Sequence, residues 1–209
     1  MTNPPRIILI DLDDTIYPAS LGLWPLFTTR IHTYMRDRVG IPENEITTTR
    51  DRLFEQYGTT MRGLQFEHGI DMHEYLDFVH NIDLSEYVHP DPALTAMLEG
   101  LTQEKWIFTN ASRAHAENIL GLMGLERFFS GIIDVVDTAP WCKPQPEAFE
   151  IALRRLGNPN PGDILFVDDR SSNLDTARGL GMATCLISPE PQNNHAHIVR
   201  LAELGTLFS

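Results

Sequence analysis

Apolar and polar positions divide the chain into regions with different patterns. Residues 7–10 form a short uninterrupted apolar run, which is typical of a strand buried on both faces of a parallel sheet. From residue 105 onward, short apolar runs alternate with amphipathic stretches, and this order predicts a parallel sheet with helices on both faces. We expect strands at residues 105–109, 131–136, 163–167 and 183–187, and helices at residues 112–120, 146–156 and 172–180.

The region between the first two strands has a helical pattern throughout. Residues 21–39 and 46–57 carry apolar side chains at helical spacing, and each stretch is followed by a glycine, which is frequent just beyond a helix end. Asp71, with an acidic residue three positions later, resembles the start of a capping box. Asp91 precedes a proline, which suits the first position of a further helix.

These patterns predict an α/β fold: a doubly wound (Rossmann-like) parallel sheet core with an inserted helical cap domain after the first strand. We assign residues 1–17 and 89–209 to the core and residues 18–88 to the cap. A cap in this position can exclude water and select among substrates. Near the end of the chain, His195 and His197 have no third metal ligand nearby in sequence, and we expect them at the start of a terminal helix.

The composition excludes several classes of partner. The chain has 16 Lys and Arg against 29 Asp and Glu, a net charge of -13, which argues against a nucleic-acid polymer as partner. An anionic substrate would be repelled at long range, so a phosphate pocket must be locally positive or assisted by a metal. Two distant cysteines do not make a disulfide framework, and no signal peptide or membrane span is apparent. We therefore expect a cytoplasmic protein without a membrane partner.

Three acidic residues follow the first strand directly. Asp11, Asp13 and Asp14 lie within four positions, and like charges at close range raise one another's pKa unless a positive group lies among them. Open α/β sheets bind ligands at the carboxyl ends of their strands. Carboxylate oxygens are ligands that Mg²⁺ prefers. The sequence therefore predicts a Mg²⁺ site at this strand end, against the alternative of a solvated acidic turn.

Residues after the later strands complete a coherent chemical set. Thr109 and Asn110, with the amides that begin at Ala111, offer donors to phosphate oxygens at a helix start. Lys143 supplies a cation for charge on a transferring phosphoryl group, and Asp168 adds a metal ligand. A carboxylate can act as a nucleophile that forms an aspartyl-phosphate. A second carboxylic acid can protonate the leaving oxygen and later activate water.

The segments DLDDT at 11–15, TN at 109–110, KPQP at 143–146 and DDRSSN at 168–173 resemble the four motifs of the haloacid-dehalogenase-like hydrolase superfamily, in order. The resemblance implies Asp11 as nucleophile and Asp13 as general acid/base. Dehalogenase members lack an acid at the second position, so the chain looks like a phosphatase or phosphotransferase. The resemblance further implies Thr109, Asn110, Ala111 and Lys143 on the phosphate, Asp11, Asp13 (through its carbonyl) and Asp168 on Mg²⁺, and Thr15, Asp169 and Asn173 as supporting residues.

Within the superfamily, the chain looks like the pyrimidine 5′-nucleotidase group. This closer resemblance includes YGTTMRGL at 57–64, which lies in the expected cap. It implies a nucleoside monophosphate as substrate, with UMP or CMP favoured. We expect Arg62 to contact the substrate, with an ordinary exposed helix arginine as the alternative reading. Tyr57 and Phe66 either stack on a base or belong to the core of the cap.

The leading expectation is a Mg²⁺-dependent phosphomonoester hydrolase that acts on a small phosphorylated metabolite through an aspartyl-phosphate. One alternative is a phosphatase or mutase for another small ester such as phosphoglycolate or a sugar phosphate. Another is a phospho-receiver or binding module without turnover. Receiver domains also combine an aspartate nucleophile, Mg²⁺, a threonine and a lysine, but their phosphorylated aspartate follows a later strand.

Overall fold

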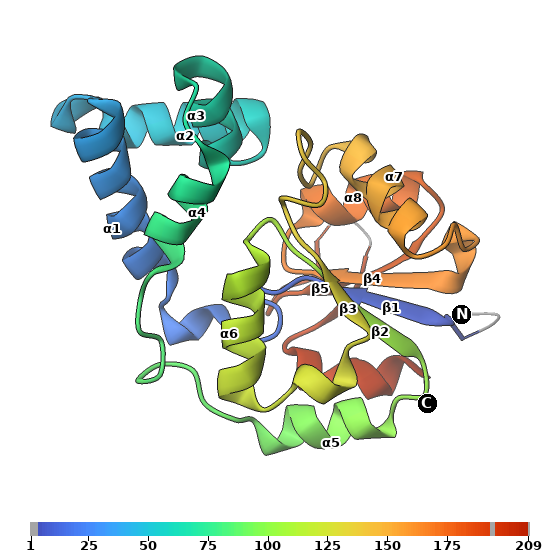
Figure 1. The fold of residues 1–209 in the computed structure, drawn as a ribbon. Helices are drawn as coiled ribbons and strands as arrows, with labels where there is room; N and C mark the ends of the chain where they lie inside the picture. The colour runs from blue at the N-terminus through green and yellow to red at the C-terminus, as the bar shows by residue number, and fades with distance from the viewer. Residues whose placement is uncertain (1–3, 193–194, 209) are drawn as a thin grey trace.

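The computed structural model describes residues 4–192 and 195–208. Its centre is a six-stranded sheet in which every pair of neighbouring strands is parallel (Figure 1). The strand order is β3-β2-β1-β4-β5-β6, with the first strand in the interior of the sheet. The strands are β1 (Ile7–Ile10), β2 (Glu104–Phe108), β3 (Gly131–Ile133), β4 (Ile164–Asp168), β5 (Ala183–Ile187) and β6 (Ala196–Ile198).

The first strand is buried on both faces, as its uninterrupted apolar run predicts. Ile8 and Ile10 belong to one hydrophobic cluster, whereas Ile7 and Leu9 belong to another on the opposite face. The first cluster includes side chains of α5 (Pro92–Gly100), α6 (Arg113–Met123) and the 3₁₀ helix Leu201–Phe208. The second includes side chains of α7 (Pro146–Arg155) and α8 (Ser171–Gly179). The doubly wound α/β core is therefore confirmed.

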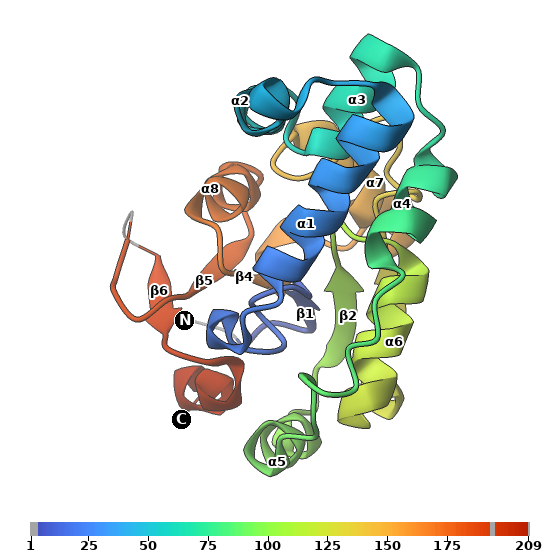
Figure 2. The same cartoon turned by 90° about the vertical axis from the view of Figure 1, so that its left-hand side faces the viewer.

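Strand register brings the acidic residues of two loops together. Ile10 pairs with Val167 of β4 and with Ile107 of β2, and the amide of Asp11 donates to the carbonyl of Val167 at 2.9 Å. Asp11 and Asp168 thus leave neighbouring parallel strands side by side. Figure 2 shows the arrow of β2 pointing toward helices α1 to α4, so the carboxyl edge of the sheet faces these helices.

Four of the helices between β1 and β2, α1 to α4, have a hydrophobic core of their own, which includes Tyr34, Leu53, Leu64 and Tyr75. Their N-terminal and C-terminal signals agree with the sequence: Asp71 accepts a hydrogen bond from the amide of Glu74 at 2.8 Å, and glycines in the left-handed conformation follow the stretches that end at residues 39 and 57. The helices are α1 (Trp24–Tyr34), continued by a π-helical turn (Met35–Val39), α2 (Ile46–Tyr57), α3 (Thr60–His68) and α4 (Met72–His80). The proposed boundaries at residues 17 and 89 stay a prediction.

One expectation about the end of the chain is wrong. His195 and His197 do not begin a helix, because Ala196–Ile198 forms β6 and pairs with β5 along its open edge. His195 is buried, with Nδ1 at 2.8 Å from Thr184 Oγ1 and Nε2 at 3.2 Å from Asp175 Oδ1. The helical segment starts later, at Leu201. Among the described residues, no helix is both long and apolar enough to cross a membrane.

The close approach of α2 and α3 depends on Gly63. A Cβ at this position would lie 2.6 Å from Leu53 Cβ and 2.7 Å from Leu53 Cδ2. We expect Gly63→Ala to lower the free energy of unfolding by about 1–3 kcal/mol, because the two helices must separate. Gly100→Ala is the matched control, since its Cβ would meet nothing within 4 Å. Urea denaturation of both variants tests this, and equal stabilities would contradict it.

Candidate active site

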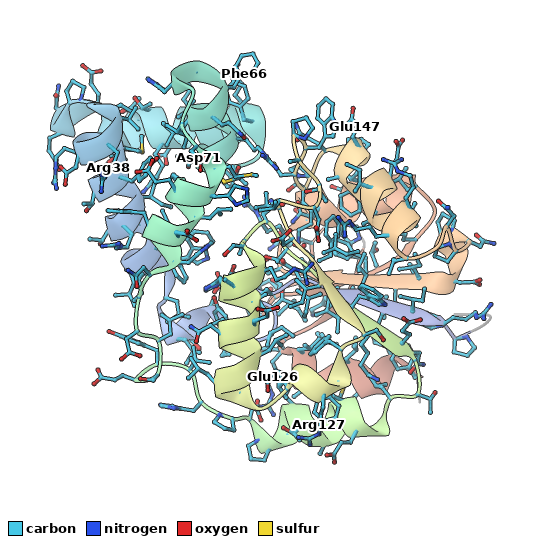
Figure 3. The ribbon with its side chains drawn as sticks, viewed as in Figure 1. Arg38, Phe66, Asp71, Glu126, Arg127 and Glu147 are labelled. Atoms are coloured by element: carbon cyan, nitrogen blue, oxygen red, sulfur yellow. The ribbon has the colours of Figure 1, made fainter. Side chains whose placement is uncertain are left out.

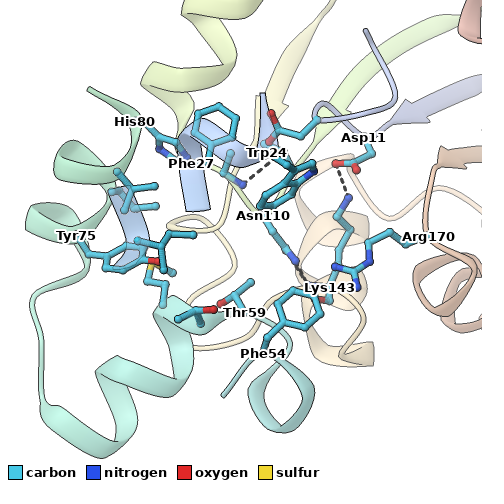
Figure 4. Close-up of a pocket in the computed structure, with 18 of the residues that line it drawn as sticks. Asp11, Trp24, Phe27, Phe54, Thr59, Tyr75, His80, Asn110, Lys143 and Arg170 are labelled. Atoms are coloured by element: carbon cyan, nitrogen blue, oxygen red, sulfur yellow. Dashed lines mark hydrogen bonds and ion pairs between the residues drawn. The ribbon is translucent and has the colours of Figure 1, made fainter. Parts of the chain in front are cut away.

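Three carboxylates surround one lysine at the carboxyl edge of the sheet. Oxygens of Asp11, Asp168 and Asp169 lie within 4.8 Å of one another. The Nζ atom of Lys143 lies 2.7 Å from Asp11 Oδ1 (Figure 4) and 2.8 Å from Asp168 Oδ2. Lys143 and Asp168 are buried, and Asp11 is nearly so. The residues from the first, third and fourth motifs therefore converge on one point.

The charges at this point do not balance. Burial raises the pKa of Asp11 well above its usual range, with further contributions from Asp168 and Asp169, and Lys143 offsets this only in part. Burial and the neighbouring Asp168 raise the pKa of Asp169 to about 7. Burial alone would lower the pKa of Lys143, but the two carboxylates beside it raise it, so this ammonium stays charged. One cation among three carboxylates leaves an excess of negative charge and of hard oxygen donors, which fits a divalent cation such as Mg²⁺.

Asn110 holds the loop that carries Lys143. Its Nδ2 donates to the carbonyl of Lys143 at 2.8 Å, and its Oδ1 accepts from the amide of Lys143 at 2.9 Å. The amide of Ala111 donates to Thr109 Oγ1 at 2.9 Å. The hydroxyl hydrogen of Thr109 and the second Nδ2 hydrogen of Asn110 are left to donate. All four residues expected on the phosphate, Lys143 included, line a cavity at this edge of the sheet, but the side chain of Asn110 and the amide of Ala111 already have protein partners.

Asp168 is held by the start of the following helix. Asn173 Nδ2 lies 2.9 Å from both carboxylate oxygens of Asp168, and the amide of Arg170 donates to its Oδ1 at 2.8 Å. The structure thus places Asn173 in contact with the acidic cluster. Because Asp168 is fully buried, these donors satisfy oxygens that would otherwise lack partners away from water.

Asp13 lies at the same edge with different neighbours. Its Oδ1 accepts from the hydroxyl of Tyr17 at 2.5 Å and lies 2.8 Å from Nε2 of His115. Burial by itself would raise the pKa of Asp13, but His115 and Tyr17 outweigh it and lower the pKa to about 2. Thr15 does not reach Asp13: its buried hydroxyl has no hydrogen-bond partner within the described part of the chain. Tyr17 and His115 are therefore contacts that the motif-based prediction missed.

A mostly apolar cavity opens above the carboxylates. Trp24 and Phe27 from α1 and Phe54 from α2 line it on the side of the inserted helices (Figure 4). The guanidinium carbon of Arg170 lies 4.4 Å from the centre of the Phe54 ring, so the core and the inserted helices meet at the rim. The cavity has a volume of ≈ 150 Å³. Its further lining comes from Ile31, Thr59, Thr60, Met61, Tyr75, Leu76, Val79, His80 and the motif residues.

Arg62 does not line this cavity. Its guanidinium is buried and donates to the carbonyls of Val135 at 2.5 Å and Trp141 at 3.1 Å, on the loop that leads to Lys143. Burial lowers the pKa of Arg62. Arg62 therefore joins α3 to the core and does not face the cavity, because its guanidinium is bound to the carbonyls of Val135 and Trp141.

The expected aromatic contacts also lie elsewhere. Phe66 projects from α3 with 78% of its surface exposed (Figure 3). Its ring lies beside that of Tyr57, with centroids 5.4 Å apart, and neither residue lines the cavity. Trp24, Phe27 and Phe54 line the cavity in place of Tyr57 and Phe66. Helical spacing alone could not distinguish these aromatic residues from the buried core of the helices.

Residues 5–181 match the family model of haloacid dehalogenase-like hydrolases. The chain therefore belongs to this family. Phosphate metabolism protein 8 of Saccharomyces cerevisiae is 27% identical over 191 residues, which cover 85% of this chain and 60% of that protein. The chain thus spans about three fifths of the length of this relative.

Solved structures show the same fold at low sequence identity. A HAD phosphatase from Thermococcus onnurineus matches with a TM-score of 0.66 and 23% identity, covering 98% of both chains. The magnesium-bound HAD-hydrolase YfnB of Bacillus subtilis matches with a TM-score of 0.63 and 20% identity, covering 99% of this chain and 100% of that one. The arrangement of the sheet and the inserted helices is therefore shared across the whole chain.

The contacts of Arg62 indicate that this residue stabilises the fold. We expect Arg62→Met to lower the free energy of unfolding by about 1–3 kcal/mol, because it removes the charged donor from the carbonyls of Val135 and Trp141 and leaves them only the hydroxyl of Thr138, at 3.4 Å and 3.0 Å. Arg52→Met is the control, since Arg52 is exposed and pairs with Glu67 at the surface; its stability should stay close to that of the wild type. Thermal and urea unfolding measure the difference. A rise in KM without any loss of stability would instead favour a substrate contact.

Proposed function

We propose that the protein is a Mg²⁺-dependent phosphomonoester hydrolase that works through an aspartyl-phosphate on Asp11. The observation that carries the proposal is the placement of the Asp11 carboxylate, held by the buried ammonium of Lys143 and facing a cavity that Asp13 also lines. The proposal includes a division into a core of residues 1–17 and 89–209 and a cap of residues 18–88, with the cavity between them.

In the first half of the proposed reaction, a carboxylate oxygen of Asp11 attacks phosphorus. The bond from phosphorus to the leaving oxygen breaks, and its electron pair stays with that oxygen, which takes a proton from Asp13. Asp13 is ionised in the free protein, so the proton enters with the substrate, whose negative charge raises the pKa of the nearby carboxylate. Lys143 and the Thr109 hydroxyl stabilise charge on the phosphoryl oxygens.

In the second half, a water molecule attacks the phosphorus of the aspartyl-phosphate and gives a proton to Asp13. The bond between phosphorus and Asp11 breaks, and its electron pair restores the Asp11 carboxylate. The products are inorganic phosphate and an enzyme ready for another substrate. Because the cap covers the carboxyl edge of the sheet, it limits which water and which ester reach this point.

The residues proposed to hold Mg²⁺ are Asp11, Asp168 and the backbone carbonyl of Asp13, with Asp169 beside them. The charge imbalance described above supports this proposal, and so does the magnesium bound to the Bacillus subtilis structure. When bound, the ion neutralises charge on the phosphoryl group and the carboxylates.

We further propose a nucleoside 5′-monophosphate, with UMP or CMP favoured, as the substrate. The aromatic side chains of Trp24, Phe27 and Phe54 line the cavity and offer ring surfaces on which a flat base can stack. The resemblance of residues 57–64 to the pyrimidine 5′-nucleotidase group supports the same substrate class, and the yeast relative is named for phosphate metabolism.

Replacing Asp11 by Asn removes the proposed nucleophile. We expect kcat for phosphate release to fall by more than about 10³-fold, with the fold retained, and we expect the wild type to lose activity when EDTA removes Mg²⁺. Asp14→Asn is the matched control, because Asp14 is a neighbouring acid with φ 59, a conformation that Asn tolerates. Phosphate release and circular dichroism measure both effects. Full activity of the Asp11 variant would exclude the mechanism.

A panel of phosphate esters tests the substrate. We expect kcat/KM for UMP and CMP to exceed that for phosphoglycolate and sugar phosphates by at least about tenfold, since the smaller esters leave the aromatic walls unoccupied. Phe54→Ala should lower kcat/KM for UMP and CMP by a larger factor than it lowers kcat/KM for p-nitrophenyl phosphate. A panel without nucleotide hydrolysis would remove the nucleotidase and leave the phosphatase.

A further inference from the structure

We propose that Tyr17 and His115 are positioning residues that tie Oδ1 of Asp13 to the protein, so that Oδ2 alone exchanges a proton with the leaving oxygen and with water. This inference rests on the proposed function, because it concerns the acid/base group of that reaction. It adds Tyr17 and His115, which lie outside the four motifs, to the residues that act in the reaction.

The hydrogen bonds of Asp13 are one-sided. Oδ1 receives two short contacts, 2.5 Å from the Tyr17 hydroxyl and 2.8 Å from Nε2 of His115. Oδ2 has no hydrogen-bond partner in residues 4–192 and 195–208, yet Asp13 lines the cavity and its side chain is 20% exposed. An oxygen that already accepts two donors is a poor proton acceptor, whereas the free oxygen faces no such competition.

Tyr17 is suited to act as a permanent donor. It lies four residues after Asp13, and only 2% of its surface is exposed. Burial, followed by the charge of Asp13, raises the pKa of its hydroxyl, so the proton stays on Tyr17. The hydroxyl therefore fixes one side of the carboxylate without entering the proton transfer.

His115 reaches Asp13 from a distant part of the chain, the first turn of α6. An ionised carboxylate only accepts hydrogen bonds, so Nε2 of His115 carries the hydrogen. Nδ1 of His115 is buried and has no partner within the described part of the chain. Asp13 is therefore the one hydrogen-bond partner of the imidazole among the described residues, and the ring serves as a fixed donor to it.

The cap holds the His115 ring in place. His80 of α4 stacks on it with centroids 4.4 Å apart and planes 15° apart, and Phe27 of α1 meets it edge-on at 5.2 Å. His80 is itself anchored, with Nδ1 at 3.1 Å from Oγ of Ser112. The orientation of Asp13 therefore depends on a ring that the core supplies and the cap packs. Seating the cap on the core completes the acid/base group.

Two half-reactions allow a test. p-Nitrophenolate leaves without a proton, so the first turnover with p-nitrophenyl phosphate does not need Asp13, whereas hydrolysis of the aspartyl-phosphate does. With Mg²⁺ present, we expect Tyr17→Phe and His115→Leu to leave the first turnover nearly unchanged and to slow steady-state turnover by about 10- to 100-fold. Stopped-flow records should then show a nitrophenolate burst, and trapped phosphoprotein should accumulate. His115→Gln, whose amide can donate from a similar position, should recover part of the steady-state rate.

Tyr87→Phe and His89→Leu, both at exposed positions, are the matched controls. The burst amplitude measures the concentration of folded, active protein. Partial unfolding of a variant therefore lowers the amplitude, but it does not change the ratio of the first-turnover rate constant to the steady-state rate constant per active site. An equal fall in both rates, or an unchanged steady state, would overturn the inference while leaving the hydrolase intact. A wild type that releases no phosphate and forms no phosphoprotein would overturn the proposed function and this inference with it.

Discussion

The excess of negative charge at the end of β1 is the constraint on which the site depends. Asp11, Asp168 and Asp169 are held close together by parallel strand register, and Lys143 supplies one buried ammonium among them. Such a cluster persists only where surrounding structure imposes it, because like charges in a poorly solvated site raise each other's pKa. The buried strands on either side impose it here. The same crowding that makes the cluster unfavourable on its own supplies hard oxygen donors for the divalent cation that we propose.

The inserted helices do more than cover this cluster. The hydrophobic core that they form also includes Val135 and Cys142, which flank the loop before Lys143. Arg62 joins the same loop through two carbonyls, and Cys142 Sγ lies 3.3 Å from the carbonyl of Tyr57. The position of the inserted helices and that of the loop carrying Lys143 are therefore linked, and the stacking of His80 on His115 extends the link to Asp13.

Sequence reasoning located the fold and the motif residues because both depend on local signals. A buried apolar run followed by acids marks a strand end, and alternating patterns mark the sheet and its helices. It was less successful with contacts. Thr15 was expected as a supporting residue, yet its hydroxyl has no hydrogen-bond partner among the described residues. Tyr17 and His115 contact Asp13 without having been expected there. Arg62 was expected on the substrate, yet it binds backbone carbonyls. The β6 strand was missed because its three residues, Ala196–Ile198, are too few to show a period and form by pairing with an edge already present.

The sequence by itself determined the doubly wound core, the place of the inserted helices and the set of residues that gather at the carboxyl edge. These features follow from local patterns, namely the apolar runs that become strands and the polar residues that follow each strand. Only the tertiary structure decided which hydrogen-bonding groups remain free there. The side chain of Asn110 and the amide of Ala111 donate to protein acceptors, the Thr109 hydroxyl accepts one bond and keeps its own hydrogen free, and one oxygen of Asp13 is hydrogen-bonded while the other is open. The physical reason is that each polar group takes the nearest partner that burial leaves available, and for His115 that partner lies 102 residues away along the chain.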